Sequence, residues 1–248
     1  YGPRSQEEIF KFPLQCVEFL FEQGCPLVVL ACNTSSANAL RRIQQEVLQE
    51  KYPDRRVLGV LAPAVEEITG CDWNGEGQAV GSAPQAVTTV GIIGTPATIA
   101  SGAYTREIKK RNDKIQVFEQ ACPNLANLIV NKAPEDEIKA DIRSCLDNMH
   151  DQMRTKGSEL PPDAVLIGCT HYALVKDILT GELSDQTRLI DQGPVTANRL
   201  QSYLEQHPEI ESLLSKEQTH KFLTTDDPEK VSKLASVFFR NEIKFEQI

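Results

Sequence analysis

The stretch PLVVLACNTSSANAL, residues 26–40, indicates the fold class, because it has the form of a buried strand that leads into a helix. A second stretch, DAVLIGCTHYALVKDIL at residues 163–179, repeats this form. Each starts with a short apolar run rich in β-branched residues, which is typical of a parallel strand buried on both faces. A cysteine follows each run, so we expect Cys32 and Cys169 where a strand ends and a helix begins.

The rest of the chain alternates strands and helices in the same way. Strands are predicted at 57–61, 87–93, 115–118 and 189–190, and helices at 5–23, 37–50, 135–156, 195–205 and 227–239. The polar, glycine-rich residues 69–84 are predicted to form a surface loop. This alternation predicts an α/β fold whose mainly parallel sheets are flanked by helices. Ligands bind such sheets at the carboxyl ends of the strands, where the two cysteines are expected.

Composition and charge exclude several classes of protein. The 248 residues are 40% hydrophobic and 25% charged, which argues against disorder, and the net charge of −9 argues against nucleic acid as a partner. No apolar run is long enough for a membrane helix. The seven cysteines include no CxxC pair, so neither a metal site nor a disulfide framework is expected. A protein of the cytoplasm, with reduced thiols, fits these features best.

The two cysteines are candidates for a pair of acid/base groups. A helix amino terminus favours a thiolate, so we expect the pKa of a cysteine at that position to be lowered. His171 follows Cys169 by two residues and could keep it ionised or relay its proton. A cysteine phosphatase is excluded, because Asn38 and Val175 stand where an arginine would hold phosphate. A thiol redox protein would need a resolving cysteine partner, and none is evident.

Five short motifs carry a resemblance to a known family. They are YGPRSQEEI, ACNTSSA, GTPAT followed by SGAYTREI, ACP, and GCTHY, and they occur in this order along nearly the whole chain. In this the chain resembles the cofactor-independent aspartate/glutamate racemases. GCTHY favours glutamate as the substrate, because relatives that act on aspartate or hydantoins usually carry another residue at the position of His171.

The resemblance implies two similar α/β lobes with the active site in the cleft between them. The first lobe would comprise residues 1–90 plus 190–248, and the second residues 91–189. One cysteine would then face the substrate from each lobe, with Cys32 deprotonating D-glutamate and Cys169 deprotonating L-glutamate. The family uses neither a metal nor pyridoxal phosphate, so no cofactor is expected.

The same resemblance implies a set of substrate-binding residues. They are Tyr1, Gly2, Asn33, Thr34, Thr98 and Thr170. Donors among them would stabilise the charge that develops on the substrate carboxylate. For Ser5 we favour a structural role as a helix N-cap, because Glu8 stands three residues later and completes a capping box.

Two departures from the family pattern stand out. The family has a strand and a DSG-type motif ahead of YG, whose aspartate assists the first catalytic cysteine, and the sequence given starts at Tyr1. We therefore expect the first lobe to lack this segment. The second departure is Val130, where the family commonly places a glutamate. Neither departure removes the cysteine pair.

Three functional readings follow from the sequence. The first is interconversion of L- and D-glutamate, supplying D-glutamate for bacterial peptidoglycan in the cytoplasm, with a homodimer as a possible assembly. The second is racemisation of aspartate or another acidic amino acid. The third is a two-lobed ligand-binding protein without activity. Loss of turnover with retained binding in a Cys32→Ser variant would separate the enzymes from the binding protein.

Overall fold

The computed structural model describes residues 4–72, 87–239 and 241–248. Tyr1, Gly2 and most of the predicted loop at 69–84 lie outside the described residues. The chain divides into two compact units, Tyr1–Leu213 and Leu214–Ile248, and each is described by itself.

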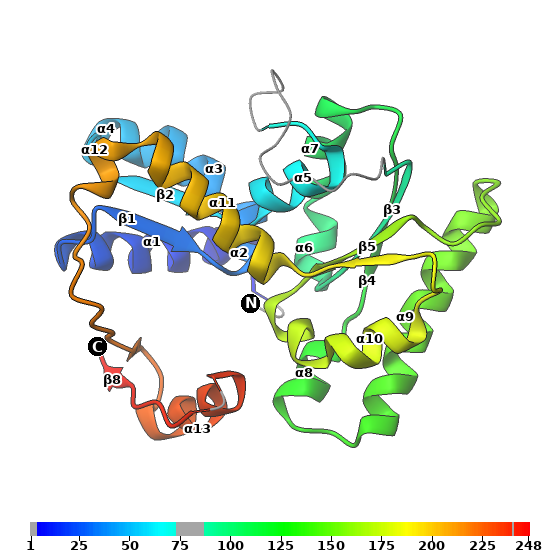
Figure 1. Cartoon of the computed structure of the whole chain (residues 1–248). Coiled ribbons are helices and arrows are strands. Elements are labelled where there is room, and N and C mark those ends of the chain that lie inside the picture. The colour runs from blue at the N-terminus through cyan, green and yellow to red at the C-terminus, as the bar shows by residue number, and fades with distance from the viewer. Residues whose placement is uncertain (1–3, 73–86, 240) are drawn as a thin grey trace. The chain divides into compact units, whose positions relative to one another are not determined.

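A four-stranded parallel sheet forms the centre of the first unit (Figure 1). Its strands are β3 (Thr89–Gly94), β4 (Gln116–Ala121), β5 (Ala164–Gly168) and β6 (Arg188–Ile190), in the order β4-β3-β5-β6. All neighbouring strands are parallel. Strand β5 is buried along its whole length, which explains why its sequence is apolar without alternation.

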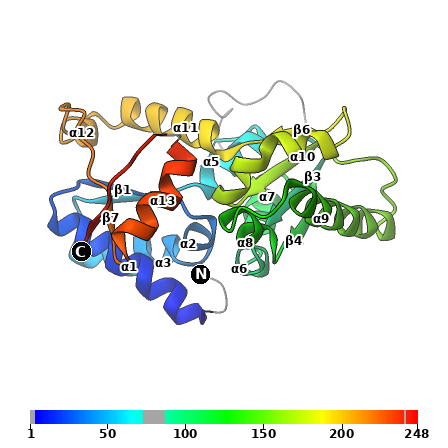
Figure 2. The same cartoon turned by 90° about the horizontal axis from the view of Figure 1, so that it is seen from below.

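Helices cover both faces of this sheet (Figures 1 and 2). On one face, Ile93, Val165 and Ile167 pack against α8 (Leu125–Val130), α9 (Glu135–Thr155) and α10 (Lys176–Glu182). On the other face, alternate residues such as Ile92 and Leu166 pack against α5 (Leu61–Thr69) and α7 (Ala103–Arg111). Successive side chains of a strand point to opposite faces, so the two apolar layers share the same strands.

A second, two-stranded parallel sheet precedes this one in the chain. Strand β1 (Leu27–Leu30) pairs with β2 (Arg56–Gly59). Around this sheet lie α1 (Gln6–Glu22), α2 (Asn33–Asn38), α3 (Leu40–Arg42), the π-helix η1 (Ile43–Leu48) and α4 (Gln49–Lys51). Phe10, Phe21, Val28, Ile43 and Val57 contribute to their common core.

Ser5 caps α1 as the sequence predicts. The amide of Glu8 donates to Ser5 Oγ at 3.3 Å, and the amide of Ser5 donates to Glu8 Oε2 at 2.8 Å. This reciprocal pair is a capping box, which satisfies two amides that the first helical turn leaves without a partner.

Two segments differ from the prediction. The helix predicted at 37–50 begins earlier, at Asn33, and contains the π-helical segment η1. The strand predicted at 57–61 ends at Gly59, and α5 begins at Leu61. Pro63 does not prevent this helix, because it lies in the first turn, where no backbone N–H is needed for an intrahelical bond.

The remaining elements complete the two units. In the first unit they are α6 (Pro96–Ala100), the 3₁₀ helix η2 (Thr170–Val175), α11 (Gln192–Gln206) and α12 (Pro208–Glu211). In the second unit, β7 (Leu223–Thr224) pairs in parallel with β8 (Glu246–Gln247), and α13 (Pro228–Phe239) lies between them in the chain.

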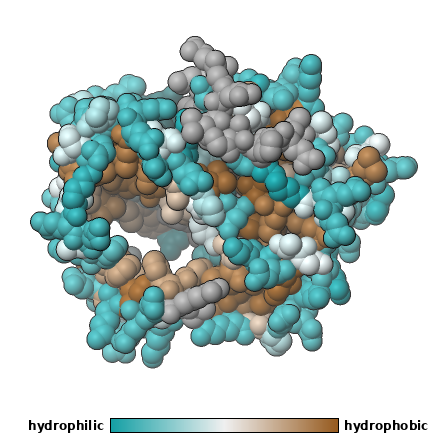
Figure 3. All heavy atoms as spheres, viewed as in Figure 1, coloured by the Kyte–Doolittle hydropathy of each residue, from teal (hydrophilic) through white to brown (hydrophobic). Residues whose placement is uncertain are grey.

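The α/β fold class is confirmed, with parallel sheets flanked by helices. The lobe boundaries inferred from the family resemblance stay a prediction. On the face shown in Figure 3, hydrophilic side chains cover much of the periphery of the first unit, and apolar ones gather toward its strands. Among the described helices, none has both the length and the apolar character to cross a membrane.

Candidate active site

Cys32 and Cys169 occupy equivalent positions in the two sheets. Cys32 follows β1 and is the N-cap residue of α2, while Cys169 follows β5 and is the N-cap residue of η2. Both line one cavity of about 600 Å³. The two parallel sheets therefore each deliver one cysteine, at a strand carboxyl end, to a common space.

The cavity also receives every other predicted site residue that the structure describes. These are Asn33, Thr34, Thr98, Thr170 and His171. The predictions for Tyr1 and Gly2 lie outside the described residues. Val130 lines the cavity as well, so the position where the family commonly has glutamate presents an apolar side chain here.

A further cavity of about 430 Å³ lies elsewhere in the first unit and has a different lining. Its described lining residues include no cysteine or histidine. Its two carboxylates are held in ion pairs, Glu66 with Arg199 at 2.7 Å and Glu107 with Arg111 at 2.9 Å. For these reasons the cavity with the two cysteines is the candidate active site.

Burial holds the Cys169 side chain in its thiol form at neutral pH. Cys169 is 7% exposed, and burial raises its pKa to about 11. Hydrogen bonding from the His171 backbone lowers this pKa, and negative charge on Cys32 raises it. The expected lowering at a helix amino terminus is therefore wrong for Cys169, because desolvation of the thiolate outweighs it.

The effect of Cys32 on Cys169 couples the two sulfurs. A thiolate at Cys32 raises the pKa of Cys169, so the state in which both sulfurs are ionised is disfavoured. A two-base reaction uses one thiolate and one thiol, and this repulsion does not penalise that state.

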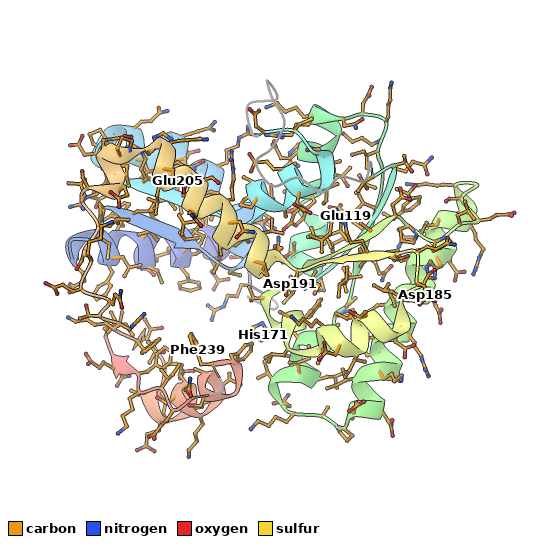
Figure 4. All side chains as sticks on the ribbon, in the orientation of Figure 1. Glu119, His171, Asp185, Asp191, Glu205 and Phe239 are labelled. Carbon is orange, nitrogen blue, oxygen red and sulfur yellow. The ribbon has the colours of Figure 1, made fainter. Side chains whose placement is uncertain are left out.

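His171 lies beside Cys169. Its Nδ1 is 3.8 Å from Cys169 Sγ, and the side chain stands at the start of η2 (Figure 4). Burial lowers the pKa of His171 below its ordinary value of 6.5. The imidazole is therefore neutral at pH 7 and can accept a proton, whereas the sequence alone left open a role as a cation that keeps Cys169 ionised.

Three hydroxyl groups among the cavity-lining residues form a triangle. Thr34 Oγ1 lies 2.9 Å from Thr98 Oγ1 and 3.1 Å from Thr95 Oγ1, and the latter two lie 3.0 Å apart. The triangle joins the first turn of α2 to the N-terminus of α6. The three O–H groups of this triangle can turn toward an anionic ligand.

A second network, of buried hydrogen bonds, holds the side chain of Asn33. Asn33 Nδ2 donates to Gln192 Oε1 at 2.7 Å, Gln192 Nε2 donates to the Tyr104 hydroxyl at 2.5 Å, and that hydroxyl donates to Asn33 Oδ1. Burial raises the pKa of Tyr104 far above its ordinary value, so the hydroxyl keeps its proton. Nothing in the sequence signals the contacts of Tyr104 and Gln192 with Asn33, because they join positions 71 and 159 residues apart.

The cavity is lined by side chains that can donate or accept protons. Its lining combines two sulfurs, one imidazole, several hydroxyls and two amides. No three metal-ligating side chains cluster among the residues that the structure describes. A small molecule with a carboxylate and an acidic C–H bond suits these groups.

Comparisons with known proteins place this site in a family. Residues 3–200 match the model of the Asp/Glu/Hydantoin racemase family, and the chain belongs to that family. It is 38% identical to a glutamate racemase of Phenylobacterium zucineum over 99% of the chain and 86% of the relative's length. It is 39% identical to one from Roseobacter denitrificans over 99% of the chain and 85% of the relative's length.

Solved structures show the same similarity. A glutamate racemase of Bacillus anthracis superposes with a TM-score of 0.81 at 26% identity, covering 100% of this chain and 83% of the other. The enzyme from Francisella tularensis, solved in complex with D-glutamate, gives a TM-score of 0.78 at 26% identity, covering 100% of this chain and 82% of the other.

Proposed function

We propose that this chain interconverts L-glutamate and D-glutamate, with Cys32 and Cys169 as the two acid/base groups. The single observation that carries the proposal is the pair of cysteines that line one cavity from the ends of two parallel sheets. Family membership supports the reaction class, and relatives named glutamate racemase at 38–39% identity support the substrate.

The proton balance of the reaction fits the coupled sulfurs. One cysteine, as a thiolate, removes the α-proton from one face of the substrate, and the electron pair of the C–H bond passes to Cα. The other cysteine, as a thiol, delivers its proton to the opposite face of Cα. The enzyme then holds the complementary protonation state, ready for the reverse reaction.

Cys169 must lose its proton when it acts as the base. Its pKa of about 11 makes that loss unfavourable at pH 7 by roughly 5 kcal/mol, at 1.36 kcal/mol for each pH unit. The ammonium group of a bound amino acid would favour the thiolate and lower this cost. The neutral imidazole of His171, with Nδ1 3.8 Å from Cys169 Sγ, can then accept the proton and pass it on. His171 is therefore proposed as the proton relay for Cys169.

The carbanion formed at Cα needs stabilisation through the substrate carboxylate. The side chains of Asn33, Thr34, Thr98 and Thr170 line the cavity and can donate to carboxylate oxygens. Donors that stand ready in a water-poor site stabilise such developing charge without reorganising. We assign substrate binding to these four residues.

This reaction would supply D-glutamate for peptidoglycan, in the cytoplasm, as the family resemblance implies. A homodimer stays a prediction. Binding of D-glutamate in the Francisella tularensis relative supports the same class of ligand for this chain.

Serine substitutions at each cysteine test the proposal. We expect Cys32→Ser and Cys169→Ser each to lower racemisation of both enantiomers, followed by circular dichroism, at least 10²-fold, while D-glutamate still binds. Cys16→Ser is the matched control, because Cys16 is exposed on α1. Full turnover in either site variant would overturn the two-cysteine mechanism.

A further inference from the structure

The ring of Asn33, Tyr104 and Gln192 joins three helices behind the cavity. Its members come from α2, α7 and α11, and they are 3%, 0% and 6% exposed. Figure 4 shows Asp191 at the start of α11, and Gln192 is the next residue. Of the three, only Asn33 lines the cavity.

The hydrogen atoms of the ring can be counted one by one. Tyr104 uses its single O–H on Asn33 Oδ1, and Gln192 uses one N–H on Tyr104 and the other on the Val60 carbonyl at 3.3 Å. Asn33 uses one of its two side-chain N–H groups on Gln192. The second N–H of Asn33 is therefore the only side-chain donor of the ring left for a ligand.

The Val60 carbonyl determines which group of each pair in the ring donates its hydrogen bond and which accepts it. If all three groups reversed their roles, Gln192 would turn its oxygen toward Val60 O, and two acceptors would face each other. A buried acceptor that faces another acceptor and lacks a donor is destabilising. The arrangement in which Asn33 Nδ2 faces Gln192 and Asn33 Oδ1 faces Tyr104 is therefore favoured over the one that reverses the Asn33 amide.

We propose that Tyr104 and Gln192 are positioning residues that act on glutamate through Asn33. They keep the Asn33 amide in the orientation that presents a donor, rather than an oxygen, to the substrate carboxylate. This inference rests on the proposed function, because it takes the ligand of the cavity to be an amino acid carboxylate.

A double-mutant cycle tests this relation. Gln192→Met keeps the size of the side chain but removes its amide, and we expect it to raise KM and the Kd for D-glutamate about 10-fold, with a smaller change in kcat. In an Asn33→Ala background the same substitution should change Kd and KM by less than about twofold, because the residue through which it acts is gone. Tyr104→Phe should behave in the same way, and it serves as the second variant if Gln192→Met fails to fold.

Gln44→Met is the matched control. Gln44 Nε2 also donates to a backbone carbonyl, that of Val57 at 2.8 Å, but Gln44 does not line the site. We expect this variant to keep the parent Kd and KM. If the fold-changes in Kd of Gln192→Met and Asn33→Ala multiply in the double variant, the two residues act independently and the inference is overturned. Unchanged Kd and KM in folded Gln192→Met and Tyr104→Phe proteins would also overturn it.

Calorimetric binding separates this inference from the proposed function. A parent protein that binds D-glutamate without racemising it contradicts the proposed function, and the cycle read in Kd still decides the role of the ring. A parent protein that binds neither enantiomer contradicts both.

Discussion

The hydroxyl oxygens of Thr34 and Thr98 lie 2.9 Å apart and tie the first turn of α2 to α6. Thr95 completes their triangle, so each hydroxyl has the other two as partners. A bound carboxylate that accepts from one of them must turn that O–H away from its neighbour. The triangle therefore holds the three hydroxyl oxygens in place before the ligand arrives, and binding turns an O–H toward the ligand.

Replacing Thr98 with valine tests how much its hydroxyl contributes to kcat/KM. The change keeps the shape of the fully buried side chain and removes its hydroxyl. We expect kcat/KM for glutamate to fall roughly 10- to 100-fold, equivalent to about 1.4–2.8 kcal/mol of lost stabilisation. Thr180→Val, which removes a hydroxyl bonded to the Lys176 carbonyl on α10, should leave kcat/KM unchanged. Equal kinetics in the two variants would show that the Thr98 hydroxyl does not contribute.

Gly168 allows β5 to place Cys169 next to β3. A Cβ atom at Gly168 would lie 2.7 Å from the Ile93 carbonyl oxygen, so Gly168→Ala must push two paired strands apart. We expect it to lower the free energy of unfolding by roughly 1–3 kcal/mol and to reduce kcat. In the control Gly181→Ala, the new Cβ meets nothing within 4 Å on α10, and stability should rise slightly. Urea unfolding of both variants measures the difference, and a fully stable Gly168→Ala protein would contradict the steric account.

The buried thiol of Cys169 should make the free energy of unfolding fall as the pH rises above 9. Its pKa is raised from 9.0 to about 11, so the folded state keeps a proton that the unfolded state loses. The contribution is complete below pH 9 and disappears as pH rises through 11, and it amounts to roughly 3 kcal/mol at most. We expect Cys169→Ser to flatten the fall in unfolding free energy between pH 9 and 11, and Cys16→Ser to leave it intact. The same slope in Cys169→Ser and the parent would contradict the raised pKa.

His171 should control activity at acidic pH. Burial lowers the pKa of His171 below 6.5, so its imidazole stays neutral to a lower pH than an exposed histidine. Activity should fall only at the lower pH at which this imidazole becomes protonated. We expect His171→Gln to lose about 10²-fold or more in kcat near pH 7 and to lose the acidic fall in the pH–rate profile. A variant with parent kcat and an unchanged profile would exclude the proton relay.

Local sequence patterns were sufficient to predict the strands and their cysteines. The apolar runs around Val28 and Leu166 indicate buried parallel strands, and the structure confirms that each leads to a cysteine at a helix N-cap. The capping box of Ser5 and Glu8 is equally local and is confirmed. Such features depend on neighbours within a few residues, which the sequence shows directly.

Features that depend on distant contacts could not be predicted in this way. The Asn33–Gln192 bond spans 159 residues, and nothing near either residue signals the other. The raised pKa of Cys169 follows from burial by surrounding elements, whereas the local position at a helix start suggested a lowered pKa. The residues that line the cavity were predictable mainly through the family resemblance, and the groups that support them were not.

Proton NMR in D₂O, with L-glutamate and D-glutamate supplied separately, tests the central claim most directly. The two-cysteine account predicts that the α-proton signal disappears from both enantiomers while their optical rotation decays. In Cys32→Ser and Cys169→Ser the decay of optical rotation should stop, and each variant should lose α-proton exchange of the enantiomer that the replaced cysteine deprotonates. An α-proton signal that persists for both enantiomers in the parent protein, or optical rotation that decays at the parent rate in either serine variant, would contradict it.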